Sequence, residues 1–292
     1  MATQATVAAP TKPAMTSPAK AILAIAGSDP SGGAGIQADL KTYASLGVYG
    51  CAAISCLTVQ NSKGVYGVQA VEPELVKEQI RKVLADLPVS HIKTGMVGTG
   101  AVARAIGECL AEFKGIIVCD PVLKASDGHD LLPSEGLAAL GEHLISRATV
   151  LTPNFTEFQV LTGLVSDSAE VIASGAAGMF DQYPHLQAII VKGGHRQEEQ
   201  PLVIDSLFIR DGRGFRSINS ERARIKTGNT HGTGCTYASA FTAYHLKTGD
   251  WPQAFQRAGD YVAELLRLSA DREMGHGAGP LWHHLFKEDN DC

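Results

Sequence analysis

Short apolar runs alternate with helical patterns along most of this 292-residue chain. AILAIA (21–26) is typical of a buried strand, and residues 35–47 place Ile36, Leu40 and Tyr43 on one helical face. Further strands are expected at 51–59, 91–95, 115–120, 148–152 and 188–194, and further helices at 73–87, 99–113 and 154–163. Strands that alternate with helices form a mostly parallel sheet covered on both faces. The sequence therefore predicts an α/β fold.

The last third of the chain departs from this alternation. SLFIRDGRGFRSI, within residues 203–219, has two strand-like halves around Asp211-Gly212, which predicts a hairpin. Helices at about 233–247 and 252–269 are expected to close the domain. Neither an internal repeat nor a linker divides residues 20–292. We expect one domain.

Composition narrows the functional classes. With 45% hydrophobic residues and a net charge of -5, the chain is not expected to bind nucleic acid or an anionic membrane. Its apolar stretches are shorter than the roughly 20 residues that span a bilayer. The six cysteines form no CxxC pair, and Cys51, Cys56, Cys109 and Cys119 stand in apolar runs. This usage indicates buried, reduced thiols and predicts a cytoplasmic protein.

Residues 1–19 differ from the rest of the chain. They are rich in Ala, Thr and Pro and contain neither an apolar centre nor an arginine. A secretory signal needs an apolar centre, and a transit peptide is rich in arginine. We expect a disordered leader.

Polar and glycine-rich clusters stand where the predicted strands end. Ligands of an open parallel sheet collect beyond the carboxyl ends of its strands. Seven clusters are expected to meet there: 27–35, 58–64, 93–98, 119–122, 152–157, 191–195 and 229–235. Their convergence predicts a ligand site on one edge of the sheet.

NTHGTGCT (229–236) is the sharpest of these signals. Two glycines bracket Thr233, and the residues that follow predict a helix. The amides of Gly232, Thr233, Gly234 and Cys235 would then lie at a helix N-terminus, which attracts anions. A glycine-rich helix start without a ligand is the alternative.

GSDPSGGAG (27–35) is not one of the common nucleotide-binding motifs. It lacks the GK[ST] ending of a P-loop, and it lacks GxGxxG with an acidic residue after the second strand. A dinucleotide-binding dehydrogenase is therefore excluded. The many glycines indicate either backbone packed against a flat ligand or a loosened strand-to-helix turn.

Three further positions carry polar groups with two interpretations each. The amide of Gln60 matches the polar edge of an aminopyrimidine, although spacing alone favours a turn residue bound to backbone. Asn154 and Glu157 share one face of a helix start, where they would hold magnesium through water or cap the helix. Lys192 stands at the end of a predicted strand, beside two glycines. It would be either a phosphate contact or a surface lysine.

Taken together, AGSDPSGGAGIQADLKT, LTVQNS, KTGM, DPV, LTPNFTE, VKGGH and NTHGTGCT resemble the successive motifs of hydroxymethylpyrimidine/phosphomethylpyrimidine kinases. The similarity runs in order from about Ala21 to about Pro280. The HGTGC ending separates this group from sugar kinases, which usually carry aspartate after GTG. The resemblance implies a ribokinase-like three-layer fold, with a mostly parallel central sheet flanked by helices. It also implies ATP, Mg²⁺ and a homodimer.

The implied activity is two successive phosphorylations in thiamine biosynthesis. The first acts on the hydroxymethyl group of 4-amino-5-hydroxymethyl-2-methylpyrimidine, and the second extends the phosphate to a diphosphate. A pyridoxal kinase is the nearest alternative, because relatives of this group phosphorylate pyridoxal at an equivalent hydroxymethyl group. Gln60 with Met96 favours the pyrimidine. A non-catalytic pyrimidine-binding protein is the second alternative, which the intact GTGC and NxxE motifs disfavour.

The resemblance also implies the residues of the pyrimidine site. The substrate would be surrounded by Gly27, Ala34, Gln60, Met96 and Val122, with Asp39 near its hydroxymethyl group. Residues 120–132 differ from the commoner DPVM-type sequence, in which a flexible loop covers the site.

For the phosphoryl-transfer site, the resemblance gives Cys235 the catalytic position. Gly232, Thr233 and Gly234 would form an anion hole, Lys192, Asn154 and Thr230 would contact ATP, and Glu157 would organise magnesium. Amides at a helix start favour a thiolate. We therefore expect Cys235 to take the hydroxyl proton in the first step.

Overall fold

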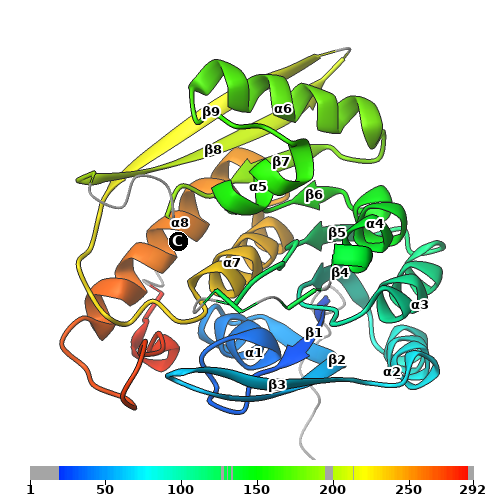
Figure 1. Cartoon of the computed structure of the whole chain (residues 1–292), viewed down its shortest axis with the longest axis horizontal. Helices are drawn as coiled ribbons and strands as arrows, with labels where there is room; N and C mark the ends of the chain where they lie inside the picture. The colour runs from blue at the N-terminus through cyan, green and yellow to red at the C-terminus, as the bar shows by residue number, and fades with distance from the viewer. Residues whose placement is uncertain are drawn as a thin grey trace, which may run out of the picture.

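The computed structural model describes residues 20–125, 128–129, 131–132, 134–194, 200–212 and 214–288 (Figure 1). Their strands form one sheet in the order β3-β2-β1-β4-β5-β6-β7-β8-β9. The strands are β1 (Ala21–Ser28), β2 (Tyr49–Asn61), β3 (Gly64–Ala70), β4 (Val89–Thr94), β5 (Ile116–Cys119), β6 (Val150–Leu151), β7 (Ala188–Val191), β8 (Leu202–Asp211) and β9 (Gly214–Ala223). The leader expected at 1–19 lies outside the described residues.

The pairing confirms the expected mostly parallel sheet. Strands β2, β1, β4, β5, β6 and β7 pair in parallel, and β8 and β9 form the predicted antiparallel hairpin. The short strand β3 was not predicted. Gly64 and Gly67 weaken its local strand signal. Its antiparallel pairing with β2, at the edge of the sheet, decides its conformation.

The helices follow the predicted pattern with two additions. They are α1 (Gly35–Ser45), α2 (Pro73–Asp86), α3 (Gly100–Leu110), α4 (Ser134–Ala139), α5 (Phe155–Thr162), α6 (Ala169–Gln182), α7 (Thr233–Thr248) and α8 (Trp251–Ser269). Irregular helical turns span Leu140–Leu144, Ile145–Arg147 and His283–Leu285. Helices α4 and α6 were not predicted. Gly175 and Gly178 dilute the pattern of α6, although Ser168 caps it by accepting from the amide of Val171.

Two separate cores make the fold three-layered. Helices α1, α7 and α8 pack on one face of the sheet, and α2, α3 and α6 pack on the other (Figure 1). Successive side chains of a strand enter opposite cores: Ile22 of β1 faces α7 and α8, whereas Leu23 faces α2 and α3. Both faces of the parallel strands are therefore buried from solvent, as their apolar runs predict.

Parallel strands place their carboxyl ends on one edge of the sheet. The loops that follow β1, β4, β5, β6 and β7 leave from this edge, and the long helix α7 begins beside it (Figure 1). Across the ranges that the structure describes, no helix is both long and apolar enough to cross a bilayer.

Candidate active site

A cavity of about 1070 Å³ opens at this edge of the sheet. All seven clusters that the sequence places at strand ends contribute to its wall. The predicted site residues that line it are Gly27, Ala34, Gln60, Met96, Val122, Asn154, Glu157, Lys192, Thr230, Gly232, Thr233, Gly234 and Cys235. The structure therefore brings together every predicted site residue except Asp39.

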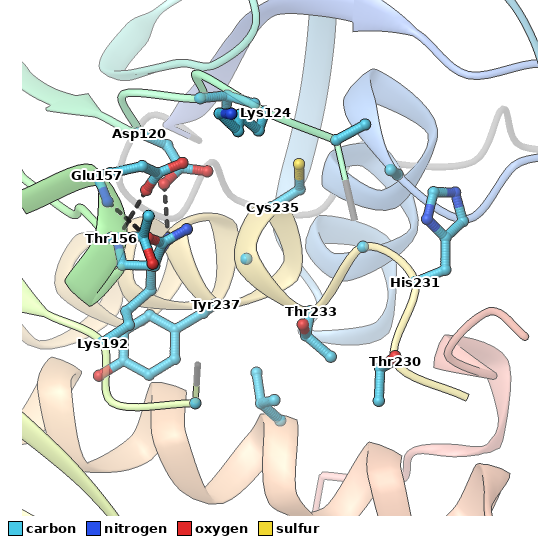
Figure 2. A pocket seen from close by; sticks show the side chains of 18 of the residues that line it. Asp120, Lys124, Thr156, Glu157, Lys192, Thr230, His231, Thr233, Cys235 and Tyr237 are labelled. Atoms are coloured by element: carbon cyan, nitrogen blue, oxygen red, sulfur yellow. Dashed lines mark hydrogen bonds and ion pairs between the residues drawn. The ribbon is translucent and has the colours of Figure 1, made fainter. Parts of the chain in front are cut away.

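Residues 230–235, here called the anion loop, turn into the first turn of α7 (Figure 2). Gly232 caps the helix with a φ of 80°, a left-handed conformation that favours glycine. A Cβ atom there would lie 1.8 Å from the carbonyl oxygen of Gly33, so the two loops pack backbone against backbone. The first-turn amides of α7 have no acceptor within the helix. The expected helix start with anion-binding geometry is present.

A buried group of charges faces the anion loop across the cavity. Nζ of Lys192 lies 2.7 Å from Oδ1 of Asp120, which also accepts from the hydroxyl of Thr152 at 3.1 Å. Figure 2 shows Glu157 beside this pair, with the sulfur of Cys235 facing the same space. Lys192 is 8% exposed, so it is not a surface lysine.

Asn154 and Glu157 cap helix α5 reciprocally. The Asn154 side chain accepts from the Glu157 amide at 2.8 Å, and Oε2 of Glu157 accepts from the Asn154 amide at 2.7 Å. Burial raises the pKa of Glu157 to about 7; Lys192 opposes this rise and Asp120 adds to it. The helix-cap interpretation is thus confirmed, and the same carboxylate also lines the cavity.

A small apolar slot forms the other end of the cavity. Cys56, Met96 and Leu131 make a cluster separate from the two main cores, with Val122 packed against it. A Cβ atom on Gly27 would lie 2.8 Å from Sγ of Cys56, so the protein has no room for a larger residue at this position. Met96, Val122 and Leu131 give this end of the cavity an apolar wall.

The Gln60 amide stands at the polar side of this slot, within β2 and not in a turn. Its Nε2 lies 3.4 Å from Nε2 of His231, which lies 2.8 Å from Oδ2 of Asp29. A carboxylate only accepts, so the N–H at Nε2 of His231 donates the hydrogen bond to Asp29. It cannot also accept from Gln60. The N–H donors of Gln60 therefore remain available to a ligand, and the interpretation as a backbone-bound turn residue is wrong.

Comparison with known proteins identifies the family. The family model for phosphomethylpyrimidine kinase matches residues 29–282. The chain belongs to this family. The sequence-based prediction of a hydroxymethylpyrimidine/phosphomethylpyrimidine kinase is confirmed, and so is the prediction that the chain is an enzyme.

Relatives of this kinase agree in sequence and in fold. The hydroxymethylpyrimidine/phosphomethylpyrimidine kinase of Bacillus subtilis is 38% identical over 92% of this chain and 96% of its own. The chain is also 38% identical to the thiamine biosynthesis bifunctional protein ThiED of Geobacter sulfurreducens, over 93% of this chain, but spans only 54% of that longer protein. The structure of pyridoxal kinase from Staphylococcus aureus in complex with AMP-PCP and pyridoxal superposes with a TM-score of 0.76, at 32% identity over 91% of this chain and 93% of that one. The ribokinase-like fold is thereby confirmed.

Two carboxylates of the kinase fit a magnesium ion held together with a nucleotide. Within the described part of the chain, no three or more His, Cys, Asp and Glu side chains form a metal-holding group. Mg²⁺ in phosphoryl-transfer sites does not need one, because phosphates and water complete its shell. Asp120 and Glu157 supply carboxylates beside the anion loop. Asp120 was not predicted as a site residue, although DPV at a strand end was its signal.

The thiol of Cys235 is protonated in the free kinase. Burial raises the pKa of Cys235 to about 11, and Lys93 only partly opposes this rise. The expectation that helix-end amides hold a thiolate is therefore wrong for the unliganded chain. Loss of water outweighs the helix terminus here.

Asp39 has its partners inside the protein. Its carboxylate is fully buried, where it accepts from Nζ of Lys93 at 2.9 and 3.1 Å and from the hydroxyl of Ser239 at 2.7 Å. Asp39 is not among the residues that line the cavity. Sequence reasoning could not anticipate this, because its partners are 54 and 200 positions away.

The kinase has three further site residues that the sequence analysis did not assign. Asp29 accepts from the amides of Gly33 and Ala34 at 3.1 and 2.8 Å and so shapes the first loop. Burial opposes ionisation, but hydrogen bonds led by the one to His231 hold the pKa of Asp29 well below its usual range. Leu131 lines the slot, and Cys56 packs against it from within the protein. Their signal in the sequence is only that of buried apolar residues.

The segment at 120–132 folds back on itself as far as it is described. The amide of Leu131 donates to Leu123 and that of Ala125 donates to His129, both at 2.9 Å. This brings Leu131 against Met96 in the slot. Residues 126, 127 and 130 lie outside the described residues, and so does that part of the expected loop.

Proposed function

We propose that the chain transfers the γ-phosphoryl group of ATP first to the hydroxymethyl group of 4-amino-5-hydroxymethyl-2-methylpyrimidine and then to the resulting monophosphate, in thiamine biosynthesis. The observation that carries this substrate is the Gln60 amide, which lines the same cavity as the apolar residues Met96 and Val122 and the anion loop. An aminopyrimidine offers a flat ring with ring nitrogens as acceptors at its edge. Gln60 would read that edge, while Met96 and Val122 contact the ring faces.

The transition state of phosphoryl transfer is loose and strongly charged, so positioning and charge stabilisation supply most of the rate. The amides of Gly232, Thr233 and Gly234 would hold the transferring phosphoryl group at the start of α7. Lys192 would contact the ATP phosphates. Magnesium, held through Asp120 and Glu157, would neutralise phosphate charge when the nucleotide is bound.

Cys235, which lines the cavity, would receive the hydroxyl proton in the first phosphorylation. Its thiol must first lose its own proton, at a cost that falls as the pH rises toward the pKa of about 11. The second phosphorylation uses an acceptor that is already anionic, so it does not need this proton transfer. The two steps should therefore depend differently on Cys235.

One assay tests the function directly. The purified chain is incubated with ATP and Mg²⁺ and, separately, with the pyrimidine, its monophosphate and pyridoxal. We expect the monophosphate and diphosphate of the pyrimidine as products and a much slower turnover of pyridoxal. Phosphorylation of pyridoxal alone would overturn the proposal, and ATP binding with no product from any acceptor would favour a non-catalytic pyrimidine-binding protein.

Pyridoxal kinase is the second candidate, because the similar Staphylococcus aureus protein is a pyridoxal kinase bound to pyridoxal. Pyridoxal has the same size and an equivalent hydroxymethyl group, but lacks the amino-substituted edge that Gln60 would read. A homodimer and a cytoplasmic location, both expected from the sequence, stay predictions. Size-exclusion chromatography with light scattering tests the first of them.

A further inference from the structure

A buried polar group lies where α1, β4 and α7 meet. It consists of Asp39 from α1, Lys93 from β4 and Ser239 from α7, and each of the three is 0% exposed. Lys93 donates to both carboxylate oxygens of Asp39, and Ser239 donates to Oδ1 at 2.7 Å. We call these three residues the buried triad. None of the roles assigned above uses it.

The triad lies one helical turn below the thiol of Cys235. Cys235 and Ser239 are four positions apart on α7, and Gly35 and Asp39 are four positions apart on α1, so each pair shares one helix face. Helices α1 and α7 lie against each other, and Ser239 donates to Asp39 across them. This hydrogen bond joins the two helices one turn beyond Gly35 and Cys235.

Lys93 is the cation of this arrangement. A Cβ atom on Gly95 would lie 2.9 Å from its Nζ, so the glycine two positions later leaves room for the ammonium group. Burial alone would lower the pKa of Lys93, but Asp39 raises it above its usual range, while burial raises the pKa of Asp39. The contacts of Nζ with both carboxylate oxygens, at 2.9 and 3.1 Å, have the geometry of an ion pair. An unpaired carboxylate at this depth would be strongly destabilising.

We propose that Lys93 is a positioning residue for Cys235: together with Asp39 and Ser239 it fixes the first turn of α7 against α1 and holds a positive charge one turn beneath the thiol. Four charged groups act on Cys235 from the surrounding elements. Lys93 of β4 and Lys192 after β7 favour its thiolate, whereas Asp39 and Asp120 disfavour it. The kinetic consequence rests on the proposed phosphoryl transfer, but the effect on the thiol does not.

The first test measures the thiol itself. Iodoacetamide reacts with thiolates, and mass spectrometry follows the peptide that contains Cys235 at each pH. In Lys93→Met the rate constant of this reaction between pH 8 and 9 should fall about tenfold or more, because an opposite charge is lost and the thiolate fraction drops. Lys82→Met, which removes an exposed lysine of α2, is the matched control and should leave this rate constant unchanged. An unchanged rate constant in folded Lys93→Met would overturn the proposal.

The second test separates positioning from stability. Lys93→Met leaves Asp39 buried without its cation, so this variant is expected to lose stability. In the double variant Asp39→Leu, Lys93→Met, apolar side chains replace the whole pair, which should restore the melting temperature. Lys93 acts on the Cys235 thiol more strongly than Asp39 opposes it, so this variant should alkylate Cys235 more slowly than the wild-type chain but faster than Lys93→Met. Its first phosphorylation should also stay slower than that of the wild-type chain, with KM for ATP unchanged.

Recovery of wild-type alkylation and kcat together with stability in the double variant would show that the pair is structural only. The alkylation readout needs no turnover, so it also separates a failure of this proposal from a failure of the proposed function. If the wild-type chain phosphorylates none of the acceptors, the alkylation rate of Cys235 still decides whether Lys93 acts on the thiol.

Discussion

The carboxylate of Glu157 reaches back 2.7 Å to the amide of Asn154, while the side chain of Asn154 accepts from the amide of Glu157 at 2.8 Å. This reciprocal cap fixes the start of α5 at the cavity wall. The same carboxylate lines the cavity. A single side chain therefore orients the helix and contributes to the cavity wall.

Glu157→Gln should separate the two roles of this residue. Glutamine keeps the cap geometry but loses the charge, so turnover should fall about 10- to 100-fold and recover partly at high magnesium. Magnesium titrations of both phosphorylations measure this. If no magnesium concentration changes the activity of the variant, Glu157 is a helix cap only.

The pKa of Glu157 also gives a pH dependence for the wild-type chain. Because its folded pKa of about 7 is above the usual 4.5, the folded state binds the extra proton, and stability falls as the pH rises from about 4.5 to 7. Glu157→Gln should remove this penalty and raise the melting temperature at pH 8. A lower melting temperature at pH 8 would contradict the raised pKa.

Gln60→Leu should weaken use of the pyrimidine. Leucine has a similar size but no hydrogen-bonding groups, and a lost buried partner costs roughly 1–3 kcal/mol. We expect KM for the pyrimidine to rise about 5- to 150-fold, with ATP binding unchanged. Asn61→Leu is the control, since Asn61 is exposed beyond the cavity wall. Unchanged kinetics with the pyrimidine would remove Gln60 from the substrate site.

Cys235→Ala should affect the two phosphorylations unequally. General-base contributions are about 10²- to 10⁴-fold, so the first step should fall within that range and the second much less. In the wild-type chain, the rate of the first step should rise with pH above neutrality, because the pKa of the thiol is about 11. Rates of the two half-reactions, measured separately, test this. Equal losses would mean that Cys235 shapes the pocket and takes no proton.

A histidine pair far from the cavity should make the fold sensitive to acid. Nε2 of His91 lies 3.0 Å from Nδ1 of His245, and His245 stacks on Trp251 with ring centroids 3.8 Å apart. Burial lowers the pKa of both histidines to about 4. For His91, the charges of His245 and Lys20 lower the pKa further. The usual pKa of histidine is 6.5.

The folded state therefore binds fewer protons than the unfolded state between pH 4 and 6.5. Stability from this pair is fully present above about pH 6.5 and is lost as the pH falls toward 4, by about 1–3 kcal/mol per histidine. Denaturant unfolding followed by fluorescence at pH 5 and 8 measures it. In His91→Gln the difference between the two pH values should shrink, whereas an unchanged difference would place the acid sensitivity elsewhere.

Local sequence determined the architecture of this protein and the place of its site. Hydrophobic periodicity is a property of neighbouring residues, and it correctly predicted β1, α1, the β8–β9 hairpin and the start of α7. The polar and glycine clusters that follow the apolar strands then had to lie close together, because parallel strands end on one edge of the sheet. The order of these motifs was enough for the family.

Tertiary structure alone decided the electrostatics and the fine shape of the site. The protonation of Cys235 depends on how much water is removed by segments that lie up to 200 positions away in the chain, and on Lys93 beneath it. The same holds for Asp39, whose partners come from β4 and α7, and for Cys56 and Leu131, which meet only when the segment after β5 folds back. Desolvation and packing are set by all neighbours at once, and a pattern of adjacent residues does not contain them.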